Sequence, residues 1–221
     1  MKTLALIALL ALPLPARAMC GPAPCEIHDC LGDSNTDQTG PPLWCQKIGG
    51  FVSYAVFVER ALGGSSVTEP AVPAPCNGDP DTTRCAREQL AYAISINHPK
   101  RVTLNYGTND LIYKFFGYVT IPQIVQAYQD RVTEAAAAGV IAYVSLTPPV
   151  FCPVGGCAYG LNEPDVEALN TALIAHFGLP NVIDAWTGFT AADFNADGIH
   201  RNQTGDTKYA HVAANFLNAH H

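Results

Sequence analysis

The sequence contains few basic residues and, after its first eighteen positions, no long apolar run. Lys and Arg number 12 against 19 Asp and Glu in 221 residues, a formal net charge of −7. This surplus of negative charge disfavours nucleic acid and anionic lipid as partners, because both are polyanionic. No stretch after position 18 approaches the roughly 20 apolar residues that a membrane-spanning helix needs. Repeats and low-complexity blocks are absent too, so we expect a single monomeric domain over residues 19–221, with no membrane anchor.

Residues 1–18 have the features of a cleaved export signal. A basic start at Lys2 precedes an apolar run over residues 4–14, and small residues stand at Ala16 and Ala18, where a signal peptidase cuts. The pattern predicts a secreted protein, extracellular or periplasmic. A lipid anchor on Cys20 is the alternative, but the Leu usual three positions before a lipidated Cys is missing.

Eight cysteines follow the predicted signal, at positions 20, 25, 30, 45, 76, 85, 152 and 157. An even number of cysteines in an exported chain favours disulfide bonds. Zinc binding is the alternative, but no pair has a His placed to complete a site. Proximity in the sequence suggests that Cys76 pairs with Cys85 and Cys152 with Cys157.

Short apolar runs alternate with segments of helical period from residue 26 onward, which predicts a parallel sheet covered by helices. The predicted strands cover residues 26–32, 54–61, 101–106, 140–146 and 181–185. The predicted helices cover residues 120–139, 164–178 and 204–217, with weaker patterns over 42–53 and 82–97. Proline-rich loops are expected over 65–81 and 147–161. Ligands bind beyond the carboxyl ends of parallel strands, so functional residues should follow the strands.

Ser34 comes directly after the first predicted strand, within the segment Gly-Asp-Ser-Asn-Thr of residues 32–36. A serine between a strand and a helix stands clear of the backbone, and the helix that follows directs free N–H groups toward a nearby anion. Such a serine is well placed to attack a carbonyl carbon. The same residue types also favour an ordinary turn or helix cap.

Two later segments carry further candidate residues. Asn109 follows the third predicted strand, where its side-chain amide could stabilise an oxyanion, although Gly, Asn and Asp also form turns. Asp197 stands three residues before His200, ahead of the last predicted helix. A carboxylate there can accept a hydrogen bond from one imidazole nitrogen and leave the other nitrogen free as a base.

Residues 193–204 also allow a calcium-loop interpretation. Oxygen ligands stand at the first, third and fifth positions, and Gly198 stands at the sixth, as in an EF-hand loop. The twelfth position, where that loop needs an acidic residue, is Thr204.

Together these segments resemble the sequence blocks of the SGNH, or GDSL, hydrolases, in the right order over residues 26–219. The segment of residues 32–34 is similar to the nucleophile block, although Asn35 replaces the Leu of the name GDSL. Residues 107–110 resemble the G-x-N-D block, and residues 197–200 resemble the D-x-x-H block. The second block is matched less well, by residues 59–64.

The resemblance implies an α/β fold: a three-layer sandwich with a five-stranded, mostly parallel sheet of flavodoxin-like type. It implies Ser34 as nucleophile, His200 as general base and Asp197 as its partner. The oxyanion hole would consist of the N–H groups of Ser34 and Gly64, with Gly63 as the alternative, and the Asn109 amide. No metal or organic cofactor is required.

Activities known in this family include carboxylesterases, lipases, lysophospholipases, thioesterases and carbohydrate deacetylases. We favour a carboxylesterase acting on short to medium acyl chains, because no long apolar segment suggests a lid for lipids. The substrate would be a small-molecule or polysaccharide ester. The aromatic stretch 111–118, expected as a loop, suggests that Phe115 and Phe116 line a substrate pocket, with ordinary packing as the alternative. A disulfide-stapled binding module without activity is the non-enzymatic alternative.

Overall fold

The computed structural model describes residues 19–20, 23–36, 44–68, 85–152 and 157–221. The predicted signal peptide and Cys76 therefore lie outside the described residues. In the part that is described, no helix combines the length and the apolar character needed to cross a membrane.

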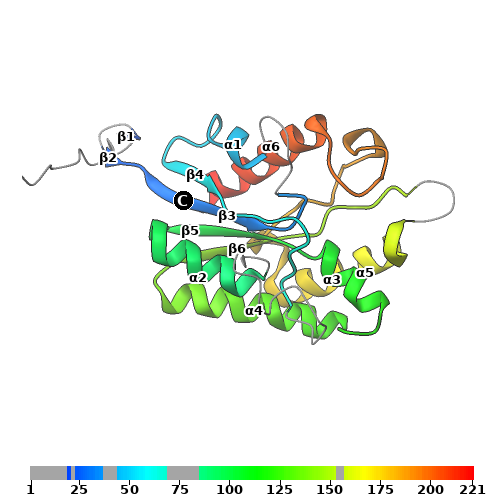
Figure 1. The fold of residues 1–221 in the computed structure, drawn as a ribbon. Coiled ribbons are helices and arrows are strands. Elements are labelled where there is room, and N and C mark those ends of the chain that lie inside the picture. Colours follow the sequence, from blue (N-terminus) through cyan, green and yellow to red (C-terminus); the bar gives the residue numbers. More distant parts are fainter. Residues whose placement is uncertain (1–18, 21–22, 37–43, 69–84, 153–156) are drawn as a thin grey trace, which may run out of the picture.

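A five-stranded parallel sheet forms the centre of the molecule (Figure 1), and each strand matches a predicted one. The strands are β3 (Glu26–Gly32), β4 (Ala55–Glu59), β5 (Arg101–Asn105), β6 (Ile141–Ser145) and β7 (Val182–Ile183). Their order across the sheet is β4-β3-β5-β6-β7. Since β3 is the first of them along the chain, this order is flavodoxin-like, and the connections reverse direction beside β3. A short antiparallel pair, β1 (Met19–Cys20) and β2 (Ala23–Pro24), precedes the sheet.

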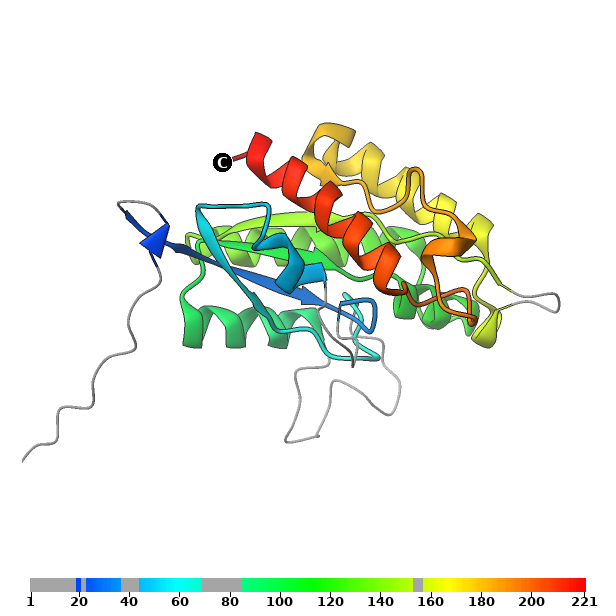
Figure 2. The same ribbon diagram turned by 90° about the horizontal axis from the view of Figure 1, so that it is seen from above.

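Helices cover both faces of the sheet, which makes the three-layer α/β/α sandwich expected from the resemblance. On one face lie α1 (Trp44–Ile48) and α6 (Gln203–Ala219), side by side in Figure 2. The other face carries α2 (Ala86–Asn97), α4 (Ile121–Ala137) and α5 (Glu163–Phe177). Neighbouring residues of a strand point to opposite faces, so Cys30 belongs to the core beneath α6 and Leu31 to the core beneath α2 and α4.

The helix boundaries follow from local signals in the sequence. Thr120 and Gln123 form a capping box at the start of α4, and Gly139, with φ of 74°, follows its end. Asn162 caps α5 by accepting from the Asp165 N–H at 3.0 Å. The helices predicted over residues 120–139, 164–178 and 204–217 are thus confirmed.

One prediction about secondary structure was wrong. Residues 111–118 were expected as a loop, but α3 (Thr108–Phe115) is a helix, and a turn begins only at Phe116. The residue before its first turn is Gly107, which has no side chain to cap the helix, so the sequence carries no local signal for the start of α3. Burial of Asp110 and Leu111 against the rest of the protein stabilises it instead.

Candidate active site

Ser34 lies in a tight turn where β3 ends, at the carboxyl edge of the sheet. The Thr36 N–H donates to the Asp33 carbonyl at 2.9 Å, and the Asp33 N–H donates to the carbonyl of Asn105, the last residue of β5, at 3.2 Å. A Cβ at Gly32 would collide with the Thr36 side chain, so the turn requires glycine there. The Ser34 side chain at the tip is only partly buried.

The helix predicted over residues 42–53 is present as α1, but it does not begin beside Ser34. Residues 33–36 form a turn, and the next described helix, α1, begins only at Trp44. Within the described residues, no helix therefore begins directly after Ser34. Among the described residues, none accepts a hydrogen bond from the Ser34 N–H.

The structure brings Ser34, His200 and Asp197 into one hydrogen-bonded chain. His200 Nε2 lies 2.8 Å from Ser34 Oγ, across 166 residues of sequence, and His200 Nδ1 lies 2.7 Å from Asp197 Oδ2. The other carboxylate oxygen of Asp197 accepts from the N–H groups of Ile199 and His200, at 2.9 and 3.0 Å. Partial burial raises the pKa of Asp197, but the hydrogen bonds from the His200 side chain and the two N–H groups outweigh it and lower the pKa below its usual value. Asp197 therefore stays ionised beside the imidazole.

Gly64 and Asn109 lie on two other segments beside the nucleophile turn. The Leu62 N–H donates to the Gly32 carbonyl at 3.2 Å, which holds the segment after β4 against the end of β3. Gly64 has φ of 82° and is exposed, and its N–H makes no hydrogen bond within the described part of the chain. Asn109, in the first turn of α3, donates one amide hydrogen to the Ser65 carbonyl at 2.9 Å. Because an amide has two N–H donors, the second stays available to a ligand.

Two buried aspartates hold these loops in place. Asp110 accepts from the N–H groups of Val67 and Thr68, at 3.0 and 2.9 Å, and Asp33 accepts from the Asn35 N–H at 2.9 Å. Burial raises the pKa of Asp33 to about 7, and it raises that of Asp110 as well. Both aspartates thus bind backbone N–H groups of the loops around the site.

Gln89 contributes to the site although nothing in the sequence singled it out. It lies buried on α2, where its Oε1 accepts from the Gly32 N–H at 3.1 Å and from the Tyr106 hydroxyl at 2.5 Å. Its Nε2 donates to the Gly32 carbonyl and to Ser65 Oγ, at 3.2 and 2.8 Å. One side chain thereby joins the end of β3, the residue after β5 and the loop that follows β4. A Gln in a weakly patterned helix carries no sequence signal for such a role.

Arg201 is the second residue that sequence reasoning missed. Its side chain is fully buried, and its guanidinium donates to the Asn35 carbonyl at 2.6 Å and to Asp206 at 3.2 Å. The signal that could have found it is its place directly after His200, with the acidic residue Asp206 five positions further on.

The structure places Phe115 and Phe116 on the surface, at the end of α3. Their side chains are 56% and 53% exposed, and their rings lie 5.2 Å apart in an edge-to-face arrangement. Phe115 also packs closely against Gly160 of the short 3₁₀ turn Ala158–Gly160. The two rings therefore form an exposed aromatic surface at the far end of α3, the helix that carries Asn109 in its first turn.

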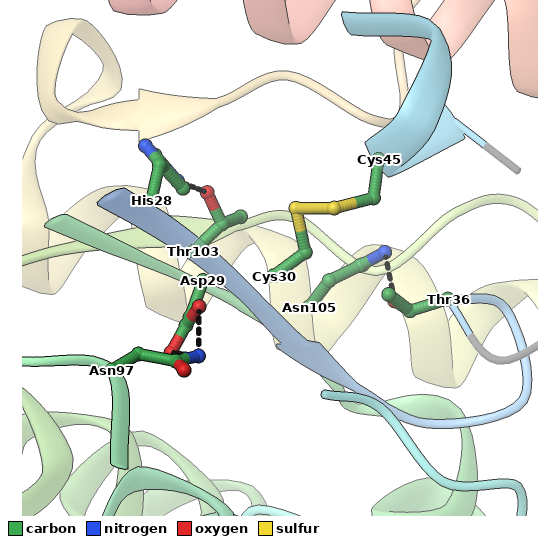
Figure 3. Close-up of a disulfide and its surroundings, with 8 residues drawn as sticks. All are labelled: His28, Asp29, Cys30, Thr36, Cys45, Asn97, Thr103 and Asn105. Atoms are coloured by element: carbon green, nitrogen blue, oxygen red, sulfur yellow. Dashed lines mark hydrogen bonds between the residues drawn. A yellow bond between two sulfur atoms is a disulfide. The ribbon is translucent and has the colours of Figure 1, made fainter. Parts of the chain in front are cut away.

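One disulfide encloses the nucleophile turn in sequence. Cys30 on β3 is bonded to Cys45 on α1 (Figure 3). The bond closes a loop of the chain that contains Ser34. Figure 3 also shows Asn105 Nδ2 donating to Thr36 Oγ1, at 3.0 Å. The predicted bond between Cys152 and Cys157 is present. The other predicted bond, between Cys76 and Cys85, involves Cys76, which lies outside the described residues. No described cysteine is free.

The carboxylates of the calcium-loop interpretation point to separate partners. Asp193 binds Lys208 at 2.8 Å and the Thr190 N–H at 2.9 Å, while Asp197 binds His200. Within residues 19–20, 23–36, 44–68, 85–152 and 157–221, no three His, Cys, Asp or Glu side chains are grouped to hold a metal ion.

A serine, an imidazole and a carboxylate in this order of contact are the constellation of serine hydrolases, which occurs on several unrelated folds. A model of the GDSL-like lipase/acylhydrolase family matches residues 30–208. The chain therefore belongs to that family, and membership implies a hydrolase of the esterase kind. A comparison with curated proteins found no match.

Solved structures of similar fold include esterases. The chain is similar to the M. smegmatis aryl esterase, at 16% identity over 88% of this chain and 99% of that one, with a TM-score of 0.63. It is also similar to a carbohydrate esterase of family 3 from Talaromyces cellulolyticus, at 22% identity over 88% and 97% of the two chains, with a TM-score of 0.59. A GDSL-like lipase from Bacteroides thetaiotaomicron matches at 14% identity over 88% and 89%, with a TM-score of 0.59. At these identities the matches show a shared fold.

Proposed function

We propose that this protein hydrolyses carboxylic acyl esters through an acyl-enzyme intermediate on Ser34. The observation that carries the proposal is the hydrogen-bonded chain from Ser34 Oγ to His200 Nε2 at 2.8 Å and from His200 Nδ1 to Asp197 at 2.7 Å. A nucleophile and a base within hydrogen-bond reach, with the base oriented by a third group, meet the geometric requirement for nucleophilic catalysis.

In the proposed reaction, Ser34 Oγ attacks the ester carbonyl carbon while His200 Nε2 accepts the hydroxyl proton. The imidazolium that forms keeps its Nδ1–H bond to the Asp197 carboxylate, which stabilises the positive charge. His200 then donates the proton to the leaving alcohol oxygen, and Ser34 keeps the acyl group. Water attacks the acyl-enzyme in the same way, with His200 again as the base, and releases the carboxylic acid.

The negative charge on the carbonyl oxygen needs hydrogen-bond donors that have no other partner. The N–H groups of Ser34 and Gly64 meet this condition within the described residues, and Asn109 has one amide hydrogen left. We assign the oxyanion hole to these three groups. We favour Gly64 over Gly63 because Gly64 is exposed and its N–H makes no hydrogen bond within the described residues.

We propose short to medium acyl chains as the acyl group, and Phe115 and Phe116 as a contact surface for the leaving group. The exposure of these rings also favours a second candidate function, the deacetylation of a carbohydrate, because aromatic faces pack well against sugar rings. The resemblance in fold to the carbohydrate esterase of family 3 supports the same candidate. The bonded cysteines support secretion into an oxidising compartment.

The test is hydrolysis of p-nitrophenyl acetate, butyrate and octanoate, and of acetylated xylan, by the wild type and by Ser34→Ala. We expect Ser34→Ala to lower kcat at least about 10⁴-fold on every ester, because the nucleophile is lost. Equal rates in both proteins would refute the assignment and favour a binding module. Release of acetate from xylan at a kcat/KM above that for the nitrophenyl esters would identify the deacetylase.

Phe115→Ala with Phe116→Ala tests the aromatic surface separately. A raised KM for the preferred ester, with kcat unchanged, is expected if the rings bind the leaving group. An unchanged ratio of kcat/KM values across the substrates would assign the rings to packing alone.

A further inference from the structure

Asn35, where this chain departs from the Leu of the family name, uses both ends of its buried side chain. Only 1% of the residue is exposed. Its Nδ2 donates to Thr108 Oγ1 at 3.3 Å, and its Oδ1 accepts from the Arg201 N–H at 3.4 Å. These bonds are long, but a buried amide without them would lose its hydration with no replacement. A leucine could make neither bond.

Each of the three segments that meet at this side chain carries a residue of the proposed mechanism. Asn35 follows Ser34, Thr108 precedes Asn109, and Arg201 follows His200. The segments come after β3, after β5 and before α6, so no single element of secondary structure fixes their relative positions. The Asn35 side chain forms a hydrogen bond with the segment of Thr108 and another with the segment of Arg201, so it links the nucleophile turn to both.

The Arg201 side chain connects the nucleophile turn at Asn35 to helix α6. Its guanidinium donates to the Asn35 carbonyl at 2.6 Å and to the Asp206 carboxylate at 3.2 Å, and it lies 4.5 Å from the centre of the Tyr209 ring. Tyr209 in turn donates its hydroxyl to Ser145 Oγ at the end of β6, at 2.7 Å. The contact therefore runs from the nucleophile turn through α6 to the sheet. A buried cation with a carboxylate partner, a carbonyl and a ring face gives this anchor a defined geometry.

We propose that Asn35 is a positioning residue, which together with Arg201 sets the distance between Ser34 Oγ and His200 Nε2 and the place of the Asn109 amide. The inference rests on the proposed function of those three residues. Its physical basis is that nucleophile, base and oxyanion donor must be held together to within a fraction of an ångström, since a displacement of about 1 Å costs about 10²-fold in rate. Asn35 touches no reacting atom and acts through its neighbours.

The test is Asn35→Leu, which keeps the approximate shape of the side chain and removes both of its hydrogen bonds. We expect kcat for p-nitrophenyl acetate to fall about 10- to 100-fold while KM changes less than about threefold. The rate at which a p-nitrophenyl phosphonate inactivates Ser34 should fall in parallel, because that reaction needs the same alignment.

Thr103→Val is the matched control. It also replaces a buried polar side chain by an apolar one of similar shape, and it removes a buried hydrogen bond, the 2.7 Å contact to His28 Nε2. Figure 3 shows this pair on the strands, away from the turn that carries Thr36. Its Tm should fall while its kcat stays within about twofold of the wild type. A loss of kcat in Asn35→Leu no larger than in this control would overturn the proposal.

Thr108→Val removes one of the two bonds and serves where Asn35→Leu does not fold. We expect a three- to tenfold fall in kcat and, where the double variant with Asn35→Leu can be made, no further loss beyond Asn35→Leu alone. A wild-type kcat in Thr108→Val would contradict a role for the hydrogen bond between Asn35 and Thr108. Losses of the two single variants that multiply in the double variant would contradict it as well. Ser34→Ala distinguishes a failure of the proposed function from a failure of this inference. If Ser34→Ala stays active, the proposed function is wrong. If Ser34→Ala is inactive while Asn35→Leu behaves like the wild type, only the positioning role of Asn35 is wrong.

Discussion

Replacing Asp197 by asparagine tests the proposed mechanism most directly, because it changes one atom at the imidazole. The asparagine carbonyl can still accept from the N–H groups of Ile199 and His200, so the local turn is preserved. Its NH₂ group, however, would face His200 Nδ1, where a carboxylate oxygen now lies 2.7 Å away. The imidazole must then turn its Nδ1 lone pair to the amide and carry its hydrogen on Nε2, which can no longer accept the Ser34 proton.

The structure also sets the size of the expected loss. The same substitution in a buried triad costs about 10⁴-fold in kcat. Here the side chains of Asp197 and His200 are 44% and 36% exposed, so water can replace part of the lost interaction. We expect kcat to fall about 10²- to 10³-fold, which corresponds to about 3 to 4 kcal/mol of transition-state stabilisation.

The chain offers a control for this prediction in Asp184→Asn. Asp184 also accepts from the N–H groups two and three residues ahead, at 3.1 and 2.8 Å, but no described histidine binds it. Both variants therefore alter an aspartate that caps a turn, and only one alters the imidazole. Steady-state hydrolysis of p-nitrophenyl acetate and the Tm of each variant are the measurements. If Asp197→Asn keeps kcat within threefold of the wild type, or falls no further than Asp184→Asn, the assigned role of the carboxylate is wrong.

Three further predictions concern stability and the oxyanion hole. Removing the disulfide with Cys30→Ala and Cys45→Ala should lower the free energy of unfolding by about 3 kcal/mol, because the bond closes a loop of 15 residues; equal urea midpoints for variant and wild type would contradict this. Burial raises the pKa of Asp33 to about 7, so its proton is held more tightly in the folded chain, and that contribution to stability is complete below pH 4 and lost as the pH rises through 7. The wild-type Tm should therefore fall between pH 5 and pH 8, and Asp33→Asn should make that fall shallower; parallel Tm curves for the two proteins would count against a buried, protonated carboxyl. Gly64→Ala should lower kcat at least tenfold, because φ of 82° disfavours a side chain and its N–H would move, whereas Gly63→Ala should change kcat less than threefold; the reverse order would assign the donor to the other glycine.

Elements that are specified by a short segment of sequence were predictable from the sequence alone. The five strands were recognisable because buried parallel strands are short apolar runs, and α4 and α5 because their caps and stops, such as Gly139 and Gly178, act within one turn of chain. The bond between Cys152 and Cys157 followed from proximity alone. In contrast, the N-terminus of α3 has no side-chain cap, and contacts with distant segments stabilise this helix, such as those of the buried Asp110 with Val67 and Thr68.

By itself, the sequence determined which elements form, in which order, and that Ser34, Asn109, Asp197 and His200 stand beside strand ends or just before a helix. The tertiary structure alone decided that 2.8 Å separate Ser34 from a histidine 166 residues away, and that Gln89, Asn35 and Arg201 hold the segments together. Local propensity acts over a few residues, so it specifies strands and helices. A hydrogen bond between buried side chains depends on the order and register of strands distant in the sequence, and the apolar pattern of a strand is the same whichever neighbour it pairs with.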